Sequence, residues 1–211
     1  MDLGVSSMQI DRPERGFSYL REGPLDMRMD ASSGQDAAGL LARIDEAALS
    51  ALLWELGVVR RARGVARAIL RARDSGRLAG TADLRRAVES VVKGADRIAE
   101  LARVFQALRI AVNGELTALD AALAALPDCL APAGRAVIIS YHSLEDRRVK
   151  RFIQRESRDC LCPPGLPVCA CAHRAAFEAL TPRAVRPAEA ELAANPRSRS
   201  ARLRAIRRLD S

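Results

Sequence analysis

The chain has 211 residues, of which 49% are hydrophobic and 28% are charged, a composition typical of a globular protein with a core of its own. It contains no run of about 18 uncharged apolar residues, so a membrane span is not expected. The first thirty residues carry six acidic side chains and no apolar signal segment, so we expect a cytoplasmic protein.

The formal net charge is +8, and residues 143–211 hold 15 of the basic and 8 of the acidic side chains. A concentrated basic segment favours a polyanionic partner, with nucleic acid first and anionic lipid second. A biased genome is a third explanation, because 32 of the 34 basic residues are arginine. Only 3% of residues are aromatic, too few for an extended stacking platform, so any nucleic acid would be bound through arginine and shape.

The first half of the chain predicts an irregular start and a helical module. Gly and Pro prevent a long helix in residues 1–30, although residues 2–7 resemble a strand end followed by a turn. Apolar residues at helical spacing predict helices over 37–56, 58–73 and 82–92. Gly57 is the expected C-terminal cap of the first helix, and Thr81 is the expected N-cap of the third.

The second half predicts an α/β arrangement. A long helix over 101–126, broken by Pro127, precedes an apolar run at 135–140 that looks like a strand buried on both faces, as in a parallel sheet. Ser143 is the expected N-cap of a helix that runs to Glu156. In open α/β sheets ligands bind at the C-terminal ends of strands, which indicates residues 2–7 and 140–143. Residues 157–181 are expected to form a loop, and 201–209 a short helix.

Two residues at these strand ends are candidate site residues. His142 could position a phosphate or a base, transfer a proton, or simply hydrogen-bond to the backbone. The Asp2 carboxylate could accept hydrogen bonds from a ligand, or cap a turn.

Five cysteines need a separate explanation. Four follow the pattern C-x-C-x₆-C-x-C, at Cys160, Cys162, Cys169 and Cys171. Zinc knuckles use C-x₂-C, and a single intervening residue points neighbouring thiols apart in an extended chain, so we expect no metal and treat these four only as weak candidate ligands. Cys129 is the fifth, and we expect it in the core.

Six ordered stretches together resemble the small-subunit rRNA cytosine-N4 methyltransferases, the RsmH or MraW family. They are residues 2–9 (DLGVSSMQ), 14–18 (ERGFS), 23–30 (GPLDMRMD), 105–110 (FQALRI), 140–147 (SYHSLEDR) and 195–201 (NPRSRSA). The similarity spans nearly the whole chain, and the cysteine loop also recurs in many members.

The resemblance implies S-adenosylmethionine as cofactor, and methylation of N4 of a cytosine in the decoding region of 16S rRNA. It implies an α/β fold, part of a Rossmann-like methyltransferase sheet with an inserted all-helical domain. The expected divisions are 1–35 (first part of the methyltransferase domain), 36–104 (inserted helical domain, for rRNA recognition) and 105–211 (second part, with the cysteine loop and the Arg-rich tail).

The resemblance also implies roles for particular residues. The family's cofactor contacts map onto Asp2 and Gln9, and the candidates for accepting the amine proton are Ser6, Ser7 and His142. The candidate contacts to 16S rRNA are all arginines, at Arg28, Arg109, Arg147, Arg197 and Arg199.

Three departures from the family pattern affect these expectations. Residue 1 corresponds to the end of the family's fourth strand, so the sequence is interpreted as N-terminally truncated and is expected to bind the cofactor weakly. Residues 57–60 (GVVR) replace Gly-Glu-Glu-Arg, and residues 96–103 (DRIAELAR) replace a Lys-x-His-Pro segment. The alternative functions are a non-catalytic rRNA-binding remnant of the family and a zinc-binding nucleic-acid module.

Overall fold

A computed structural model describes residues 1–163 and 168–210. The chain forms two compact units, each with its own hydrophobic core: Met1–Gly4 with Leu116–Ser211, here called the sheet unit, and Val5–Glu115, here called the helical unit. By their contacts, residues 5–35 and 105–115 belong to the helical unit, and the expected methyltransferase division of the chain stays a prediction. None of the described helices is long and apolar enough to cross a membrane.

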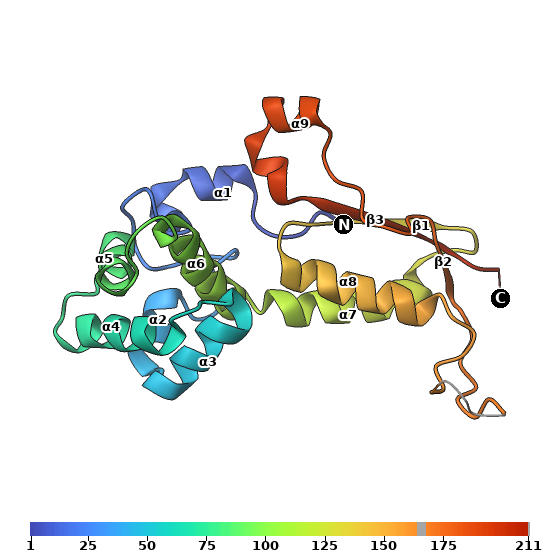
Figure 1. Cartoon of the computed structure of the whole chain (residues 1–211), viewed down its shortest axis with the longest axis horizontal. Helices are drawn as coiled ribbons and strands as arrows, with labels where there is room; N and C mark the ends of the chain where they lie inside the picture. The colour runs from blue at the N-terminus through green and yellow to red at the C-terminus, as the bar shows by residue number, and fades with distance from the viewer. Residues whose placement is uncertain (164–167, 211) are drawn as a thin grey trace. The chain divides into compact units, whose positions relative to one another are not determined.

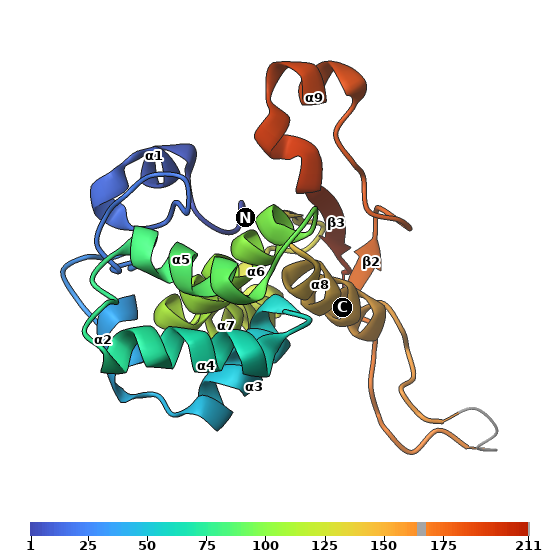
Figure 2. The same cartoon turned by 60° about the vertical axis from the view of Figure 1, so that its left-hand side comes forward.

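The helical unit contains six α-helices and a short 3₁₀ turn within its described residues (Figures 1 and 2). They are α1 (Ser7–Asp11), the 3₁₀ turn Pro13–Arg15, α2 (Ala37–Arg43), α3 (Glu46–Gly57), α4 (Ala62–Asp74), α5 (Thr81–Val91) and α6 (Arg97–Asn113). Helix α3 packs against α4 and α6, and α4 packs against α5. The apolar stripes read from the sequence form this core, with Leu53, Ile69 and Leu108 fully buried.

Three predicted helix boundaries in this unit are wrong for local reasons. The predicted helix 37–56 is two helices, because Asp45 starts a new one by accepting a hydrogen bond from the Ala48 amide at 2.7 Å. Helix α3 includes Gly57, and Val58 takes the left-handed cap conformation with φ of 53°. Thr81 is the first residue of α5 and not its N-cap, since its hydroxyl accepts from the Gly23 amide at 2.9 Å.

The predicted long helix 101–126 is also two helices. Helix α6 ends at Asn113, and its C-cap Gly114 has a φ of 59°, in the left-handed region that favours glycine. Helix α7 (Glu115–Cys129) follows directly and continues through Pro127. Cys129 ends it in an exposed position, so the prediction of a core cysteine is wrong.

The sheet unit contains a three-stranded antiparallel sheet in the order β1-β3-β2. Its strands are β1 (Arg135–Ser140), β2 (Phe177–Ala179) and β3 (Arg202–Arg208). Residues 1–3 pair with β1 in the parallel direction, through a bridge between Asp2 and Ile139. The Leu3 amide donates to the Ile139 carbonyl at 3.0 Å, and the Ile139 amide donates to the Met1 carbonyl at 2.9 Å.

The strand predicted at 135–140 is confirmed in its bounds, and it has a parallel neighbour in residues 1–3, but it is not buried on both faces. Ile138 is 1% exposed whereas Val137 is 44% exposed, so β1 buries one face and lies beside an antiparallel neighbour. The tail expected as a helix is β3, because pairing with β1 overrides its local preference. The predicted loop 157–181 contains β2.

Helices α7 and α8 (Ser143–Glu156) cover one side of this sheet (Figure 1). Leu123 of α7, Val149 of α8, and Ile138, Phe177 and Ile206 of the three strands are all in the same buried cluster. A short helix α9 (Glu189–Ala194) and a 3₁₀ segment (Pro196–Ser200) precede β3. The mixed α/β class is confirmed, whereas the Rossmann-like sheet stays a prediction.

Candidate functional site

Asp2 and His142 lie at the same end of the sheet, as the sequence predicted. The bridge between Asp2 and Ile139 is parallel, so the N-terminal segment and β1 run out of the sheet in the same direction. Asp2 is exposed, and its carboxylate lies near the Tyr141 side chain. Partial burial raises the pKa of Tyr141, and the Asp2 carboxylate raises it further, so this hydroxyl stays a donor. The Asp2 carboxylate is open to a ligand.

Ser6, Ser7 and Gln9 belong to the helical unit and form the start of α1. The Ser6 hydroxyl accepts from the Gln9 amide at 3.3 Å, and Gln9 Oε1 accepts from the Ser6 amide at 2.9 Å. This reciprocal capping box leaves the Gln9 Nε2 group to donate to a ligand. Ser7 is exposed at the first position of the helix.

His142, and not the predicted Ser143, is the N-cap of α8. Its Nδ1 accepts from the Glu145 amide at 3.4 Å, while Glu145 Oε2 accepts from the amides of Tyr141 at 2.9 Å and His142 at 3.3 Å. Because Nδ1 is an acceptor here, the neutral ring carries its proton on Nε2. The geometry therefore supports a positioning role for His142 more than proton acceptance.

Glu145 remains ionised in this buried position. Burial alone would raise its pKa, but hydrogen bonds from the His142 side chain and from the amides of Tyr141 and His142 outweigh burial and lower the pKa below its ordinary value of 4.5. The side chain is 4% exposed, and its Oε1 lies 3.3 Å from His142 Nε2. The strand-end loop and the first turn of α8 are thus held by one carboxylate.

Asp146 connects the same turn to the Arg-rich tail. Its Oδ2 lies 2.8 Å from Arg202 Nη1, and its Oδ1 lies 2.8 Å from Arg204 Nε. Burial would raise the pKa of Asp146, but these two arginines lower it overall. Arg207 pairs with Glu178 at 2.9 Å, and Arg208 donates to the carbonyls of Pro127 and Leu130. The arginines of β3 therefore stabilise the sheet unit, which the sequence alone did not indicate.

Two of the five candidate rRNA contacts are also engaged in ion pairs. Arg28 pairs with Asp26 through Nε at 2.8 Å and Nη2 at 3.0 Å, and this pairing lowers the pKa of Asp26. Arg109 pairs with Glu115 through Nε at 2.7 Å and Nη2 at 2.9 Å. These bidentate pairs give both arginines a structural role within the helical unit.

The other three candidates are exposed. Arg147 lies on α8, and Arg197 and Arg199 lie on the segment Pro196–Ser200. Between the last two, Ser198 is buried and its hydroxyl donates to the Asn195 carbonyl at 2.8 Å. This inward serine fixes the turn from which the two flanking arginines extend.

Arg147 belongs to a row of arginines that the sequence motifs did not reveal. Arg147, Arg151 and Arg155 are four residues apart, the spacing of one helix face, and all line a hollow between α7 and α8. Among the described residues Arg147 and Arg151 have no ion-pair partner, whereas Arg148 pairs with Asp120 at 3.1 Å. The i, i+4, i+8 spacing was the signal that could have found this face.

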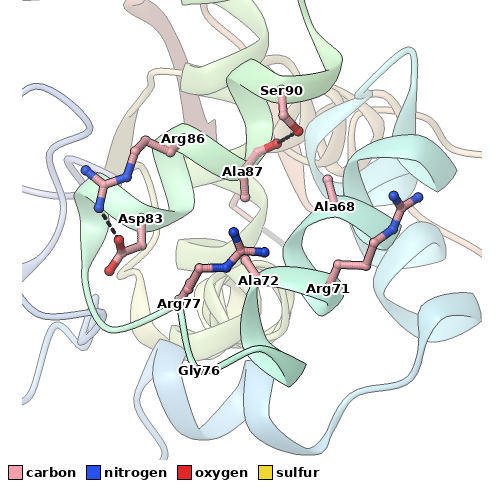
Figure 3. A pocket seen from close by; sticks show the side chains of 9 residues that line it. All are labelled: Ala68, Arg71, Ala72, Gly76, Arg77, Asp83, Arg86, Ala87 and Ser90. Carbon is pink, nitrogen blue, oxygen red and sulfur yellow. Dashed lines mark hydrogen bonds and ion pairs between the residues drawn. The ribbon is translucent and has the colours of Figure 1, made fainter.

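A second basic hollow lies between α4 and α5 of the helical unit (Figure 3). Arg71, Arg77 and Arg86 line it, with Asp83 as the carboxylate among its lining residues. Asp83 pairs with Arg86, and Arg77 Nε donates to the Ser75 hydroxyl at 2.9 Å. Three guanidinium groups around one carboxylate leave a positive surface that suits an anion.

The structure brings the four clustered cysteines together. Their sulfur atoms all lie within 4.8 Å of one another, so the expectation that C-x-C spacing separates the thiols is wrong. The chain is not extended here, and Ala172 has a φ of 49° immediately after Cys171. The amides of Leu161 and His173 donate to the Cys171 sulfur and lower the pKa of that thiol to about 6.

Known proteins include several that are similar to this chain over nearly its whole length. A relative in Thermomicrobium roseum, named ribosomal RNA small subunit methyltransferase H, is 50% identical over 209 residues, which are 99% of this chain and 64% of the relative. Proteins of the same name in Rubrobacter xylanophilus and Anaeromyxobacter sp. strain K are 54% and 51% identical, over 96% and 99% of this chain and 64% and 68% of those relatives.

The chain thus spans about two thirds of the length of these relatives. The sequence profile of the MraW methylase family matches residues 1–209, a range that contains Asp2, Gln9, His142 and the arginine faces. The chain belongs to the MraW methylase family.

Proposed function

We propose that this chain acts in the methylation of N4 of a cytosine in the decoding region of 16S rRNA, with S-adenosylmethionine as methyl donor. The observation that carries the proposal is the family match over residues 1–209. The proposed fold is part of a Rossmann-like methyltransferase sheet with an inserted helical domain, in a cytoplasmic protein. The relatives' name supports small-subunit rRNA as substrate.

The residues assigned to the cofactor fit its chemistry. S-adenosylmethionine carries hydroxyl and ammonium donors, which suit the exposed Asp2 carboxylate. It also carries hydrogen-bond acceptors. These suit the Gln9 Nε2 group, which the capping box does not use because it engages Oε1. Gly4 has a φ of 83°, a backbone conformation that residues with a side chain rarely adopt, and it lies two residues after Asp2. When bound, the cofactor supplies an electrophilic methyl group.

The residues around the target base must position it and remove a proton. The amino nitrogen of cytosine is a poor nucleophile, because its lone pair is delocalised into the ring, so precise alignment with the methyl group is needed. The base must also leave its stack or already be single-stranded. We assign His142 and Ser6 to positioning, since the Glu145 amide donates to His142 Nδ1 and the Gln9 amide donates to the Ser6 hydroxyl. We keep the exposed Ser7 as the candidate that accepts the amine proton and passes it to solvent.

Exposed arginines are the proposed contacts to rRNA phosphates. Arg147 and Arg151 on α8, with Arg197 and Arg199 before β3, supply charge in the sheet unit. The hollow lined by Arg71, Arg77 and Arg86 supplies it in the helical unit. Because these surfaces need no cofactor, they also fit the second candidate function, a non-catalytic rRNA-binding protein.

A methyl-transfer assay separates the two functions. Protein purified from the organism that encodes it is incubated with methyl-labelled S-adenosylmethionine and small-subunit rRNA, and labelled nucleosides are identified. We expect label in N4-methylcytidine, and about a tenfold to hundredfold loss of transfer for Asp2→Asn, which removes a charge-assisted hydrogen bond. Asp128→Asn is the matched control, since Asp128 is exposed on α7. Binding of rRNA without any transfer would support the non-catalytic function instead.

A further inference from the structure

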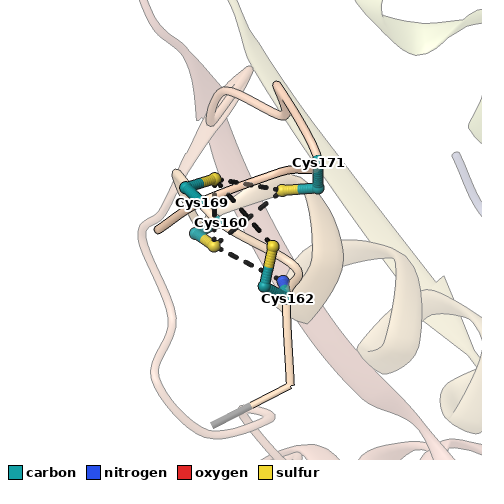
Figure 4. A group of neighbouring side chains, drawn as sticks. All are labelled: Cys160, Cys162, Cys169 and Cys171. Carbon is teal, nitrogen blue, oxygen red and sulfur yellow. Dashed lines mark hydrogen bonds between the residues drawn. The ribbon is translucent and has the colours of Figure 1, made fainter. Parts of the chain in front are cut away.

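The loop between α8 and β2 holds four cysteines for which the proposed methylation has no use (Figure 4). They come as two C-x-C pairs, Cys160 with Cys162 and Cys169 with Cys171. Residues 164–167 lie between the pairs, outside the described residues. All four thiols are free, and three of the four residues are exposed.

The distances among the sulfurs are those of a tetrahedral metal site. Cys160 Sγ lies 3.4 Å from Cys169 Sγ and 3.8 Å from Cys171 Sγ. Cys169 Sγ lies 3.6 Å from Cys171 Sγ and 4.0 Å from Cys162 Sγ. Four sulfurs placed tetrahedrally at about 2.3 Å from a Zn²⁺ ion are about 3.8 Å apart. Disulfides would instead bring the sulfurs pairwise to about 2.05 Å.

Backbone amides around the cluster point at the sulfurs. The Leu161 amide donates to Cys171 Sγ at 3.3 Å, the Cys162 amide to Cys160 Sγ at 3.4 Å, and the Ala170 amide to Cys162 Sγ at 3.4 Å. Such N–H groups stabilise negative charge on sulfur, and hydrogen bonds of this kind orient and tune metal ligands. Each C-x-C segment thus donates a backbone amide to a sulfur of the other pair, and the first segment also donates one to its own Cys160.

The loop has little else to hold it in shape. No described residue from 158 to 174 is buried, so the loop has no hydrophobic core of its own. Its base is tied by the Ala175 amide, which donates to Asp159 at 3.2 Å, and by a hydrogen bond of 3.0 Å between His173 Nε2 and the Arg155 carbonyl. These contacts join the segments before and after the cysteines at the base of the loop. Beyond them, the clustered sulfurs are the groups that could cross-link the two cysteine pairs.

We propose that Cys160, Cys162, Cys169 and Cys171 bind one Zn²⁺ ion as a closed, structural tetrathiolate site. Zn²⁺ binds all four sulfurs as thiolates, so the protons of those that are still thiols are released to solvent. The site then carries a net charge of −2, which the exposed Arg158 and Arg174 beside the two pairs partly offset. Four thiolates leave no open position for a substrate, so the ion cross-links the loop and takes no part in methyl transfer.

Metal analysis of the full chain tests this proposal. After purification under reducing conditions and dialysis, we expect one zinc ion per chain, and with Co²⁺ the intense sulfur-to-metal absorption and visible bands of a tetrahedral thiolate site. X-ray absorption at the zinc edge should show four sulfur neighbours at about 2.3 Å. Because binding competes with protons, zinc occupancy should fall on acidification.

Variants and proteolysis provide the controls. Cys160→Ser with Cys169→Ser should lower the zinc content at least tenfold, whereas Cys129→Ser, at the exposed fifth cysteine, should leave it at one ion. Removing zinc from the wild-type chain should speed tryptic cleavage after Arg158 and Arg174, and returning it should reverse the change. Zinc-free protein with reduced thiols, iron in place of zinc, disulfides in the isolated protein, or equal zinc in the double variant would each overturn the proposal.

Discussion

Arg204 of β3 and Asp146 of α8 form a nearly buried ion pair, with Nε 2.8 Å from Oδ1 and Nη2 3.4 Å from Oδ2. Their side chains are 11% and 7% exposed. Asp146 also accepts from Arg202, so one carboxylate joins the helix after the strand-end loop to the last strand of the chain. The C-terminal arginines are therefore part of the framework that positions His142.

Replacing Asp146 by Asn should destabilise the chain. The change removes the counter-charge of Arg204, which is 11% exposed, and of Arg202, which is 40% exposed, and should lower the free energy of unfolding by about 2–4 kcal/mol, mostly through Arg204. Asp120→Asn is the control. Asp120 of α7 also pairs with an arginine of α8, Arg148, but the Asp120 side chain is 55% exposed. Urea unfolding should show a loss of less than about 0.5 kcal/mol for this control. Equal losses for the two variants would contradict the structural role of Asp146.

Acid should weaken the same region. Folding lowers the pKa of Glu145 and of Asp146 below their ordinary values of 4.5 and 3.8. Their contribution to stability is therefore complete above about pH 5 and declines as the pH falls through the native pKa values. Urea midpoints measured from pH 7 to pH 3 should fall, and the fall should be shallower in Glu145→Gln. A midpoint that rises on acidification would contradict the direction of both shifts.

Asn113 should hold the segment that carries residues 23–30 in place. Its Oδ1 accepts from the Met29 amide at 2.6 Å, and its Nδ2 donates to the Met27 carbonyl at 2.7 Å. Asn113→Ala should cost about 1–3 kcal/mol, because it leaves partly buried backbone groups unpaired. Hydrogen exchange of the Met29 amide should accelerate, whereas Asn195→Ala, at an exposed residue, should leave it unchanged. Unchanged exchange in Asn113→Ala would show that other contacts hold the segment.

The sequence predicted those elements whose signals are local. The bounds of β1 and the end of α8 at Glu156 follow from an apolar run and a capped helix, and both are confirmed. Strand β3 could not be found this way, because its Arg-rich sequence becomes a strand only through pairing with β1, more than sixty residues earlier in the chain. The break at Gly114 was missed because a single glycine within a helical pattern is compatible with a continuous helix.

The site residues divide in the same way. The strand-end pattern predicted that Asp2 and His142 lie at the same end of the sheet, and the structure confirms this. The ion pair of Arg109 with Glu115 depends on a helix boundary that was not predicted. Convergence of the cysteines depends on the fold of the loop, including the left-handed Ala172, which the spacing of the thiols does not reveal.

The arginine face of α8 should bind rRNA through charge. Arg147→Glu with Arg151→Glu should weaken binding and flatten its salt dependence by about 0.7 in the log–log slope for each phosphate that the variant no longer neutralises. Arg147→Lys with Arg151→Lys keeps the charge and should retain most of the affinity. Binding is measured by filter retention at several salt concentrations. Equal affinities and equal salt slopes for the two double variants would contradict this role.

Charge reversal at Arg197 and Arg199 extends this test to the segment before β3. Both are exposed on either side of the buried Ser198, so their replacement by Glu should flatten the salt slope. A loss of stability with an unchanged slope would instead make this segment structural.

The central claim, that this chain serves cytosine-N4 methylation of 16S rRNA, is tested most directly in the organism that encodes it. The gene is deleted, and N4-methylated cytidine in the decoding region of 16S rRNA is measured by mass spectrometry of the isolated fragment. We predict that the modification disappears, that the wild-type gene restores it fully, and that the Asp2→Asn gene restores it only partly. An unchanged level of N4-methylated cytidine after deletion would contradict the account.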